Sequence, residues 1–219
     1  MKHTPATALV TGFEPFDGEP VNPSREIARA LDGELIAGHR IVGAVLPTGF
    51  ARALPVLDTL IDARRPALVL ALGLAGGRSG ISLERVAINL IDARIADNAG
   101  EQPVDVPVVE NAANAYFSTL PLKAMLARLA AAGIPATLSH TAGTFVCNQV
   151  FFGLADRIAM RDRQLRGGFI HVPWLPEQAA RHGDAPGMPL ATMIDAIRLC
   201  LETALTAHTD LRYASGTEH

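Results

Sequence analysis

The chain has 219 residues, of which 49% are hydrophobic and 19% charged, and its formal net charge at pH 7 is -3. A chain of this length buries roughly 70% of its unfolded surface, which is enough for one core without a disulfide framework or a structural metal. The composition excludes the disordered classes of protein, and the lack of a basic cluster argues against a nucleic-acid-binding groove.

Short apolar runs alternate with segments of helical periodicity along the whole chain. Strands are predicted at residues 8–11, 40–46, 67–74, 137–140 and 168–172. Helices are predicted at residues 24–31, 50–63, 120–131, 145–160 and 189–207. Residues 84–95 have the composition of extended chain, whereas residues 97–110 and 175–188 are predicted to be irregular loops.

This alternation, without a repeat or a break in composition, predicts a single domain over residues 1–219. The expected fold class is α/β, an α/β/α sandwich with a mainly parallel, twisted sheet and helices on both faces. The last few residues are expected to form a disordered tail. In such folds ligands bind in the loops beyond the carboxyl ends of the strands, so candidate residues are sought there.

Cys147 is the candidate nucleophile. It follows the strand predicted at 137–140 and a glycine-containing turn, which places it in the first turn of the next helix. The unpaired N–H groups and partial positive charge of a helix N-terminus favour a thiolate and would hold an oxyanion. The alternative interpretation of Cys147 is a small buried apolar residue, which is the interpretation preferred for Cys200 in the last predicted helix.

A cysteine nucleophile needs a base and a group that orients the base. His171 is the preferred base because it lies at the carboxyl end of its predicted strand, at the rim where Cys147 emerges. His140, just before the glycine turn, is its competitor. The rim carboxylates that could orient the base are Glu14, Glu84, Asp92, Asp97 and Glu177, and spacing alone does not choose among them.

Other sites find little support in the sequence. The loop GLAGGRSG at residues 73–80 fits neither the P-loop nor the dinucleotide-binding spacing, and is typical of a tight turn that approaches a ligand. Neither a metal-ligand set nor the serine-hydrolase pattern G-x-S-x-G is present. The first residues do not resemble a signal peptide, and the longest apolar run is too short to span a bilayer, so a cytoplasmic protein without membrane contact is expected.

Four segments carry a family likeness. They are TGFEPFDG at 11–18 with NPS at 22–24, AGGR at 75–78 with ERVAIN at 84–89, TAGTFVCN at 141–148, and GFIHVPWLPEQ at 168–178. In this order they resemble the C15 family of cysteine peptidases, the pyroglutamyl peptidase I (pyrrolidone-carboxylate peptidase) family. The resemblance implies removal of an N-terminal pyroglutamyl residue from peptides, no cofactor, no metal, and a homotetramer.

The resemblance also implies roles for individual residues. Cys147 would be the nucleophile, His171 the base and Glu84 the orienting acid, the choice that spacing leaves open. Phe13 and Phe16 would sandwich the flat lactam ring, and Arg94 would lie near the oxyanion. The full set of residues implied to bind the substrate is Phe13, Phe16, Asn22, Thr48, Leu74, Arg94, Ile95, Phe145 and Val146.

One residue departs from the family pattern, because members often have Gln where this chain has Leu74. If that position acts through its backbone, Leu serves equally well; if it acts through its side chain, affinity or rate should fall. The alternative functions are another cysteine amidohydrolase with a different acyl group and a non-catalytic homologue that binds lactams or peptides. A fold like that of nucleoside phosphorylases is less favoured, because no basic phosphate-binding set is evident.

Overall fold

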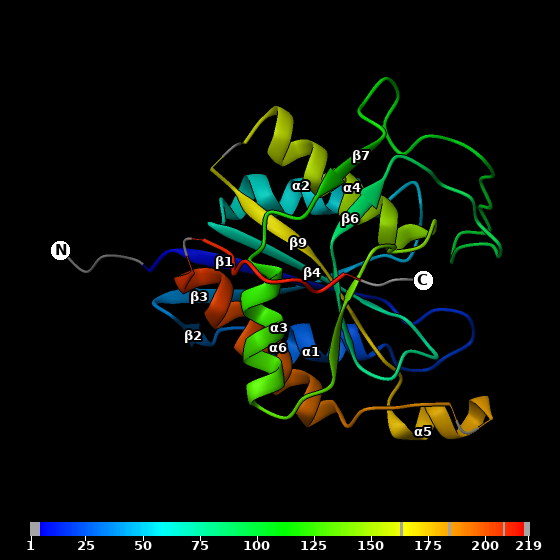
Figure 1. Cartoon of the computed structure of the whole chain (residues 1–219). Coiled ribbons are helices and arrows are strands. Elements are labelled where there is room, and N and C mark those ends of the chain that lie inside the picture. Colours follow the sequence, from blue (N-terminus) through cyan, green and yellow to red (C-terminus); the bar gives the residue numbers. More distant parts are fainter. Residues whose placement is uncertain (1–4, 163, 184, 208, 217–219) are drawn as a thin grey trace.

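The structure of the protein, a computed structural model, describes residues 5–162, 164–183, 185–207 and 209–216 (Figure 1). Its centre is a seven-stranded sheet. In spatial order the strands are β2 (Leu35–Ile36), β3 (His39–Leu46), β1 (Thr7–Phe13), β4 (Leu68–Leu74), β9 (Arg166–Val172), β5 (Ile81–Glu84) and β8 (Ala136–Ser139). A separate antiparallel ribbon pairs β6 (Val86–Ile88) with β7 (Ala115–Phe117).

The main sheet is mixed but mainly parallel, as predicted. Strands β3, β1, β4 and β9 run in one direction. Strand β5 is antiparallel to β9 and parallel to β8, and the short edge strand β2 is antiparallel to β3. The strand direction therefore reverses between β9 and β5.

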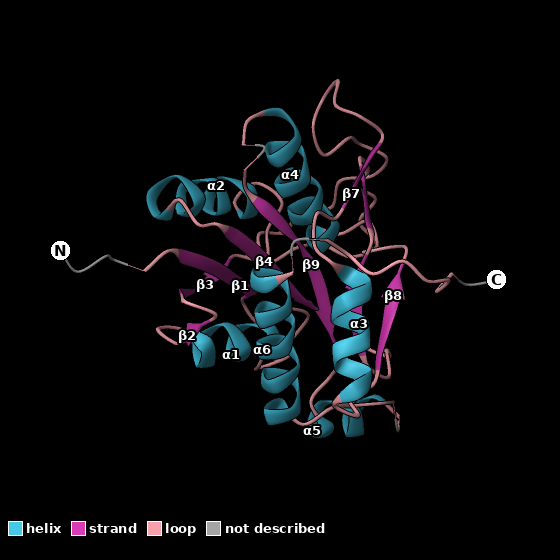
Figure 2. Ribbon diagram, turned by 60° about the vertical axis from the view of Figure 1, so that its left-hand side comes forward, coloured by secondary structure: helices cyan, strands magenta, loops and turns pink. Residues whose placement is uncertain are grey.

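Helices cover both faces of the sheet, which confirms the α/β sandwich (Figure 2). On one face lie α2 (Ala53–Arg64) and α4 (Val146–Met160), and on the other lie α1 (Pro23–Leu31), α3 (Leu122–Ala131) and α6 (Leu190–Thr206). Among the described residues, no helix is both long and apolar enough to cross a membrane.

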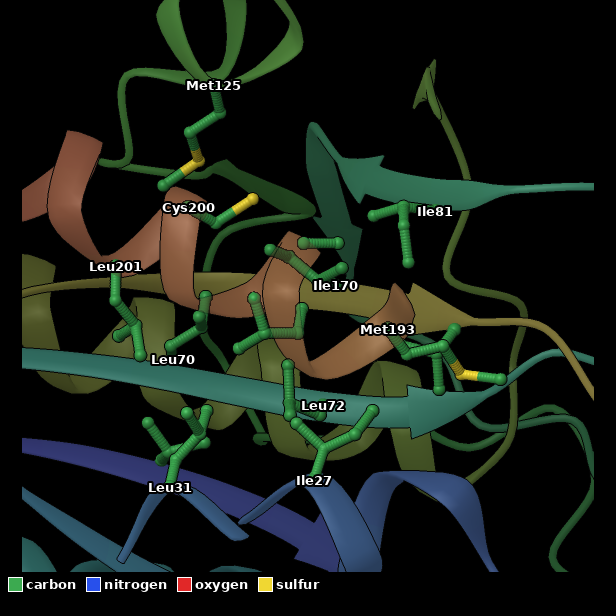
Figure 3. Packing of buried hydrophobic residues seen from close by; sticks show 14 of the residues in the cluster. Ile27, Leu31, Leu70, Leu72, Ile81, Met125, Ile170, Met193, Cys200 and Leu201 are labelled. Carbon is green, nitrogen blue, oxygen red and sulfur yellow. The ribbon is translucent and has the colours of Figure 1, made fainter. Parts of the chain in front are cut away.

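Strand β4 shows why the sheet is buried on both faces. Successive strand side chains point to opposite faces, so Leu70 and Leu72 enter the core under α1, α3 and α6, while Val69 and Ala71 enter the core under α2 and α4. Figure 3 shows the first of these cores. Cys200 of α6 is fully buried within it, which confirms its interpretation as a core residue.

The predicted helices and strands are all present, with ends that differ by at most three residues. The prediction for residues 84–95 is wrong for most of the segment: Glu84 ends β5, Val86–Ile88 form β6 and Ile91 makes an isolated bridge with Val106, but the other residues join no ladder. The prediction of a loop over 175–188 is also wrong: α5 (Pro176–Ala179) and the 3₁₀ turn Ala180–His182 lie there. Pro176 opens α5, and Gln178 Oε1 accepts a hydrogen bond from the Leu175 N–H at 3.1 Å. The disordered tail expected for the last few residues falls on residues 217–219, which lie outside the described residues.

Candidate active site

Glu84 and His171 lie on the same face of the sheet because of strand alternation. Leu83 of β5 and Ile170 of β9 belong to the core under α1, α3 and α6, so their neighbours Glu84 and His171 point to the other face, toward α4. There His171 Nδ1 lies 2.7 Å from Glu84 Oε1. Both side chains are buried, and Glu84 has no exposed surface.

Cys147 reaches this site by a different path from the one expected. Strand β8 runs opposite to β9 and ends level with Phe169, so it does not end beside His171. Residues 140–145 carry the chain onward to α4, where Cys147 is the second residue. A methyl group on Gly73, which pairs with His171 in the ladder, would lie 2.8 Å from Cys147 Sγ. Cys147 and His171 line one cavity.

The contact with Glu84 sets the state of the His171 ring. A carboxylate can only accept hydrogen bonds, so Nδ1 carries the ring proton and its N–H donates a hydrogen bond to Glu84. This leaves Nε2 as the basic nitrogen of the neutral ring. The competing base, His140, is exposed, and its Nε2 lies 3.5 Å from Arg85 Nη1. His140 is not among the residues that line the cavity.

The other candidate carboxylates lie away from His171. Asp97 accepts the backbone N–H groups of Phe50, Ala99 and Glu101 at 2.8–2.9 Å, so it organises a loop. Glu14, Asp92 and Glu177 are exposed. Of the five candidate carboxylates, Glu84 is the one that contacts His171.

Burial dominates the protonation of the site. Burial raises the pKa of the Cys147 thiol to about 12, the charge of Glu84 adds to this rise, and Arg78 opposes it. Burial also lowers the pKa of His171, although the hydrogen bond from His171 to Glu84 and the carboxylate charge partly compensate. Burial thus opposes the thiolate that the N-terminus of α4 favours, and it favours the neutral form of the imidazole.

Glu84 remains a carboxylate. Its burial favours the neutral acid, but the hydrogen bond and charge of His171, together with the Arg78 charge, hold the pKa of Glu84 below its ordinary value. Arg78 Nη1 lies 2.6 Å from Glu84 Oε1. The site thus combines a thiol, a base and a charged acceptor that fixes the base.

The start of α4 offers donors for an oxyanion. Phe145 precedes the helix without a side-chain cap, and the first intrahelical bond runs from Gln149 N to Phe145 O at 3.1 Å. The N–H groups of residues 146–148 precede that bond, so they have no intrahelical acceptor. Asn148 anchors this turn: its amide donates to Ile88 O and Leu90 O at 2.9 and 3.0 Å.

The cavity has a volume of about 590 Å³. All nine residues that the resemblance assigns to substrate binding line it: Phe13, Phe16, Asn22, Thr48, Leu74, Arg94, Ile95, Phe145 and Val146. Aromatic rings form its apolar part. The ring centroid of Phe16 lies 5.1 Å from that of Phe145, which lies 5.0 Å from that of Phe50. Phe13 is buried, with its ring centroid 6.4 Å from that of Phe169.

Asn22 and Thr48 support the cavity wall. Asn22 Nδ2 and Thr48 Oγ1 both donate to the carbonyl of Glu14, at 3.0 and 3.1 Å. Asn22 Oδ1 also caps α1 by accepting the Ser24 N–H at 3.1 Å. These two side chains therefore fix the loop that follows Phe13.

Sequence reasoning missed one wall of the cavity. Trp174 and His182 stack there, with ring centroids 4.1 Å apart. His182 lies 2.9 Å from Glu19, whose other oxygen accepts from Gln178 and Arg181 at 2.9 and 2.5 Å. His182 was missed because it lies in residues 175–188, which the sequence predicted to be a loop. Trp174 lies in the motif GFIHVPW, which could have indicated it.

A second hollow, of about 670 Å³, lies elsewhere and is a poorer candidate. It opens near Thr7, at the amino end of β1, and near Arg157 of α4. Arg157 is paired there with Asp58 at 2.8 Å and with Asp62. Neither cysteine of the chain lines this hollow.

The chain is similar to known proteins over nearly its whole length. The family model described as pyroglutamyl peptidase matches residues 6–207. The chain is 53% identical over 214 residues to pyrrolidone-carboxylate peptidase of Cupriavidus necator, covering 97% of this chain and 99% of that one. It is 54% identical over 213 residues to pyrrolidone-carboxylate peptidase 1 of Ralstonia nicotianae, with the same coverage.

A solved structure gives the same result. The fold is similar to that of pyroglutamyl peptidase I from Bacillus amyloliquefaciens, with a TM-score of 0.92 and 42% sequence identity. The match covers 94% of this chain and 100% of that chain. The chain therefore belongs to the pyroglutamyl peptidase family.

Proposed function

We propose that this protein is a cysteine exopeptidase that removes an N-terminal L-pyroglutamyl residue from peptides. The observation that carries the proposal is the shared cavity of Cys147 and His171, with His171 held by the buried Glu84 at 2.7 Å. The names of the relatives specify the acyl group, pyroglutamate (pyrrolidone carboxylate).

The chemistry of the cavity suits this acyl group. Pyroglutamate is a neutral five-membered lactam without a free α-amine, so it needs apolar faces and hydrogen-bonding groups rather than a carboxylate. Phe13, Phe16 and Phe145 supply aromatic faces, and we propose that the first two sandwich the ring. A site built to pair the lactam N–H and C=O rejects rings that lack them.

Acylation uses three groups of the chain. Cys147 Sγ attacks the carbonyl carbon that links the pyroglutamyl residue to the next one, while its proton passes to His171 Nε2. The oxyanion is held by N–H groups at the start of α4, with Arg94 nearby. When the C–N bond breaks, the imidazolium returns the proton to the leaving amine, and the pyroglutamyl group remains on sulfur as a thioester.

Deacylation repeats the steps with water. His171 Nε2 takes a proton from the water as its oxygen attacks the thioester carbon. The C–S bond breaks, the sulfur regains a proton and free pyroglutamate leaves. Glu84 stabilises the imidazolium in both halves and is not itself protonated.

The test is release of a fluorescent amine from a pyroglutamyl amide, with the matching prolyl amide as control. Prolyl has the same ring size but a charged amine in place of the lactam. We expect cleavage of the pyroglutamyl amide only. Cleavage of a different acyl amide would favour another cysteine amidohydrolase. Tight binding of the pyroglutamyl amide without turnover would favour a non-catalytic homologue, and either result overturns the proposal.

We propose that Leu74 serves through its backbone, because it closes the ladder of β4 with β9 at the cavity wall. Leu74→Gln is then expected to change kcat/KM for the pyroglutamyl amide by less than about threefold. A gain of about tenfold or more, equivalent to about 1.4 kcal/mol, would instead assign the function to the side chain.

Gly73→Ala is expected to lower kcat by about 10²-fold, because the added methyl group would lie 2.8 Å from Cys147 Sγ and displace the nucleophile. Gly49→Ala is the matched control. Its added methyl group would meet only Asp97 Oδ2, at an ordinary 3.5 Å, and activity should stay at the wild-type level. Steady-state kinetics of both variants checks this, and a fully active Gly73→Ala enzyme would contradict the placement of the sulfur.

We also propose a cytoplasmic homotetramer. The tetramer is supported by the family resemblance and by large exposed apolar side chains, among them Leu35, Phe117 and Met160. A cytoplasmic location suits a thiol that must stay reduced. Size-exclusion chromatography with light scattering should give four times the chain mass, and a monomer at micromolar concentration would contradict the assembly.

A further inference from the structure

Arg78 lies in the loop between β4 and β5, at the edge of the cavity, and the mechanism above gives it no role. Its guanidinium reaches two parts of the site at once. Nη1 lies 2.6 Å from Glu84 Oε1, and Nη2 donates to the carbonyl oxygen of Thr141 at 3.0 Å. We propose that Arg78 is a positioning residue that fixes the orienting acid and the segment leading to the nucleophile; this rests on the proposed function.

The first contact makes a buried charge tolerable. Glu84 has no exposed surface, and its Oε1 is shared by His171 Nδ1 and Arg78 Nη1. Within the described part of the chain its Oε2 has no hydrogen-bond partner. A carboxylate in such a position is costly unless a cation pairs with it. Arg78 is that cation, so Glu84 stays charged and presents one fixed oxygen to His171.

The second contact fixes the approach to Cys147. The Thr141 carbonyl that Arg78 binds also accepts the Ser139 hydroxyl at 3.0 Å, and Thr141 Oγ1 accepts the Gly143 N–H at 3.1 Å. These bonds define the turn that precedes α4. A planar guanidinium has two Nη groups, so it can bind the carboxylate and this carbonyl at the same time. An ammonium group lacks this planar pair of donors.

The charge of Arg78 also bears on the base. The charged groups that act on His171 are Glu84, which raises its pKa, and Arg78, which lowers it. The other ionisable residues at the cavity make no hydrogen bond to His171 in the part of the chain that the structure describes; they are Asp17, Glu19, Arg94, Cys147 and His182. Loss of the Arg78 charge should therefore raise the pKa of His171, and Glu84→Gln should lower it.

The experiment compares Arg78→Met and Arg78→Lys with Arg85→Met, a control whose arginine lies beside Glu84 in sequence but outside the cavity. With the pyroglutamyl amide we expect Arg78→Met to lower kcat by about 10²-fold with little change in KM. The acid limb of its pH profile should move to higher pH, and that of Glu84→Gln to lower pH. Arg78→Lys should return the acid limb of the pH profile to its wild-type position but recover only part of kcat. Arg85→Met should match the wild type in both.

Two further measurements decide between positioning and general damage. If Arg78 acts mainly through Glu84, the double variant Arg78→Met/Glu84→Gln should lose much less activity than the product of the two single losses, and the extra loss beyond Glu84→Gln reports the Thr141 contact. The proposal would be overturned if the losses of kcat in the two single variants multiplied fully in the double variant. It would also be overturned if the acid limb of the pH profile did not move in a folded Arg78→Met enzyme. The pH dependence of Cys147 alkylation by iodoacetamide reads the same shift without substrate. It separates failure of this proposal from failure of the proposed peptidase activity.

Discussion

Cys147→Ala is expected to lower kcat on a pyroglutamyl amide by about 10⁴-fold or more, because no other cysteine and no serine lines the cavity among the described residues. Binding should survive, since alanine removes only the sulfur and leaves the aromatic rings and the start of α4 in place. KM or an inhibition constant for a non-cleaved pyroglutamyl analogue should change by less than about tenfold. Steady-state kinetics of the purified variant gives both numbers.

Cys200→Ala is the matched control. Cys200 is fully buried in the core of α6 and the sheet and lines none of the cavity. Its replacement should reduce the stability of the fold slightly and leave kcat at the wild-type level. Retained activity in Cys147→Ala, or its loss only in Cys200→Ala, would show that the nucleophile has been misassigned.

His171→Ala is expected to lower kcat by about 10⁴-fold, because the Cys147 thiol then has no base to take its proton. The pH dependence of the wild type follows from the same group. His171 must be neutral to act, and burial lowers its pKa below the ordinary value of 6.5. The wild-type kcat/KM should therefore hold down through pH 6.5 and fall only at lower pH, as the imidazole becomes protonated.

His140→Ala separates the two candidate bases. His140 is exposed and lies outside the cavity, so this variant should keep wild-type kcat and the wild-type acid limb. Added imidazole should restore part of the activity of His171→Ala by filling the space that the side chain leaves. An inactive His140→Ala enzyme beside an active His171→Ala enzyme would reverse the assignment of the base.

Local patterns in the sequence were sufficient to predict the parts of the site that each depend on one element. The apolar run that became β4 is buried on both faces, as its composition predicts. Cys147 lies at the start of a helix because a glycine turn and a helical pattern adjoin it in the chain. His171 lies near the end of a strand for the same reason.

The partners of these residues could not be predicted, because long-range pairing sets them. Glu84 follows Leu83 in a four-residue strand whose neighbour β9 lies more than eighty residues further along the chain. Nothing local shows that the polar face of that strand is buried under α4, and buried carboxylates are rare enough that spacing favours a surface position. The resemblance to a family supplied this choice.

The protonation of Cys147 and the direction of strands β5 and β8 could not be predicted from the sequence either. The helix N-terminus correctly indicated donors near Cys147, but the degree of burial decides the pKa of the thiol, and burial is a property of the assembled fold. The reversal of β5 and β8 against β9 likewise depends on which edges pair. The 3₁₀ turn that brings His182 onto Trp174 follows from the Gln178 contacts rather than from any periodic pattern.

The most direct test of the mechanism is capture of the acyl-enzyme. A pyroglutamyl ester with a good leaving group acylates faster than an amide, so the thioester should accumulate and survive an acid quench. Peptide mass spectrometry should then find one pyroglutamyl group on the peptide that contains Cys147, and none on that of Cys200 or in Cys147→Ala. An acyl group on any other residue, or rapid turnover of the ester by Cys147→Ala, would contradict a thioester on Cys147.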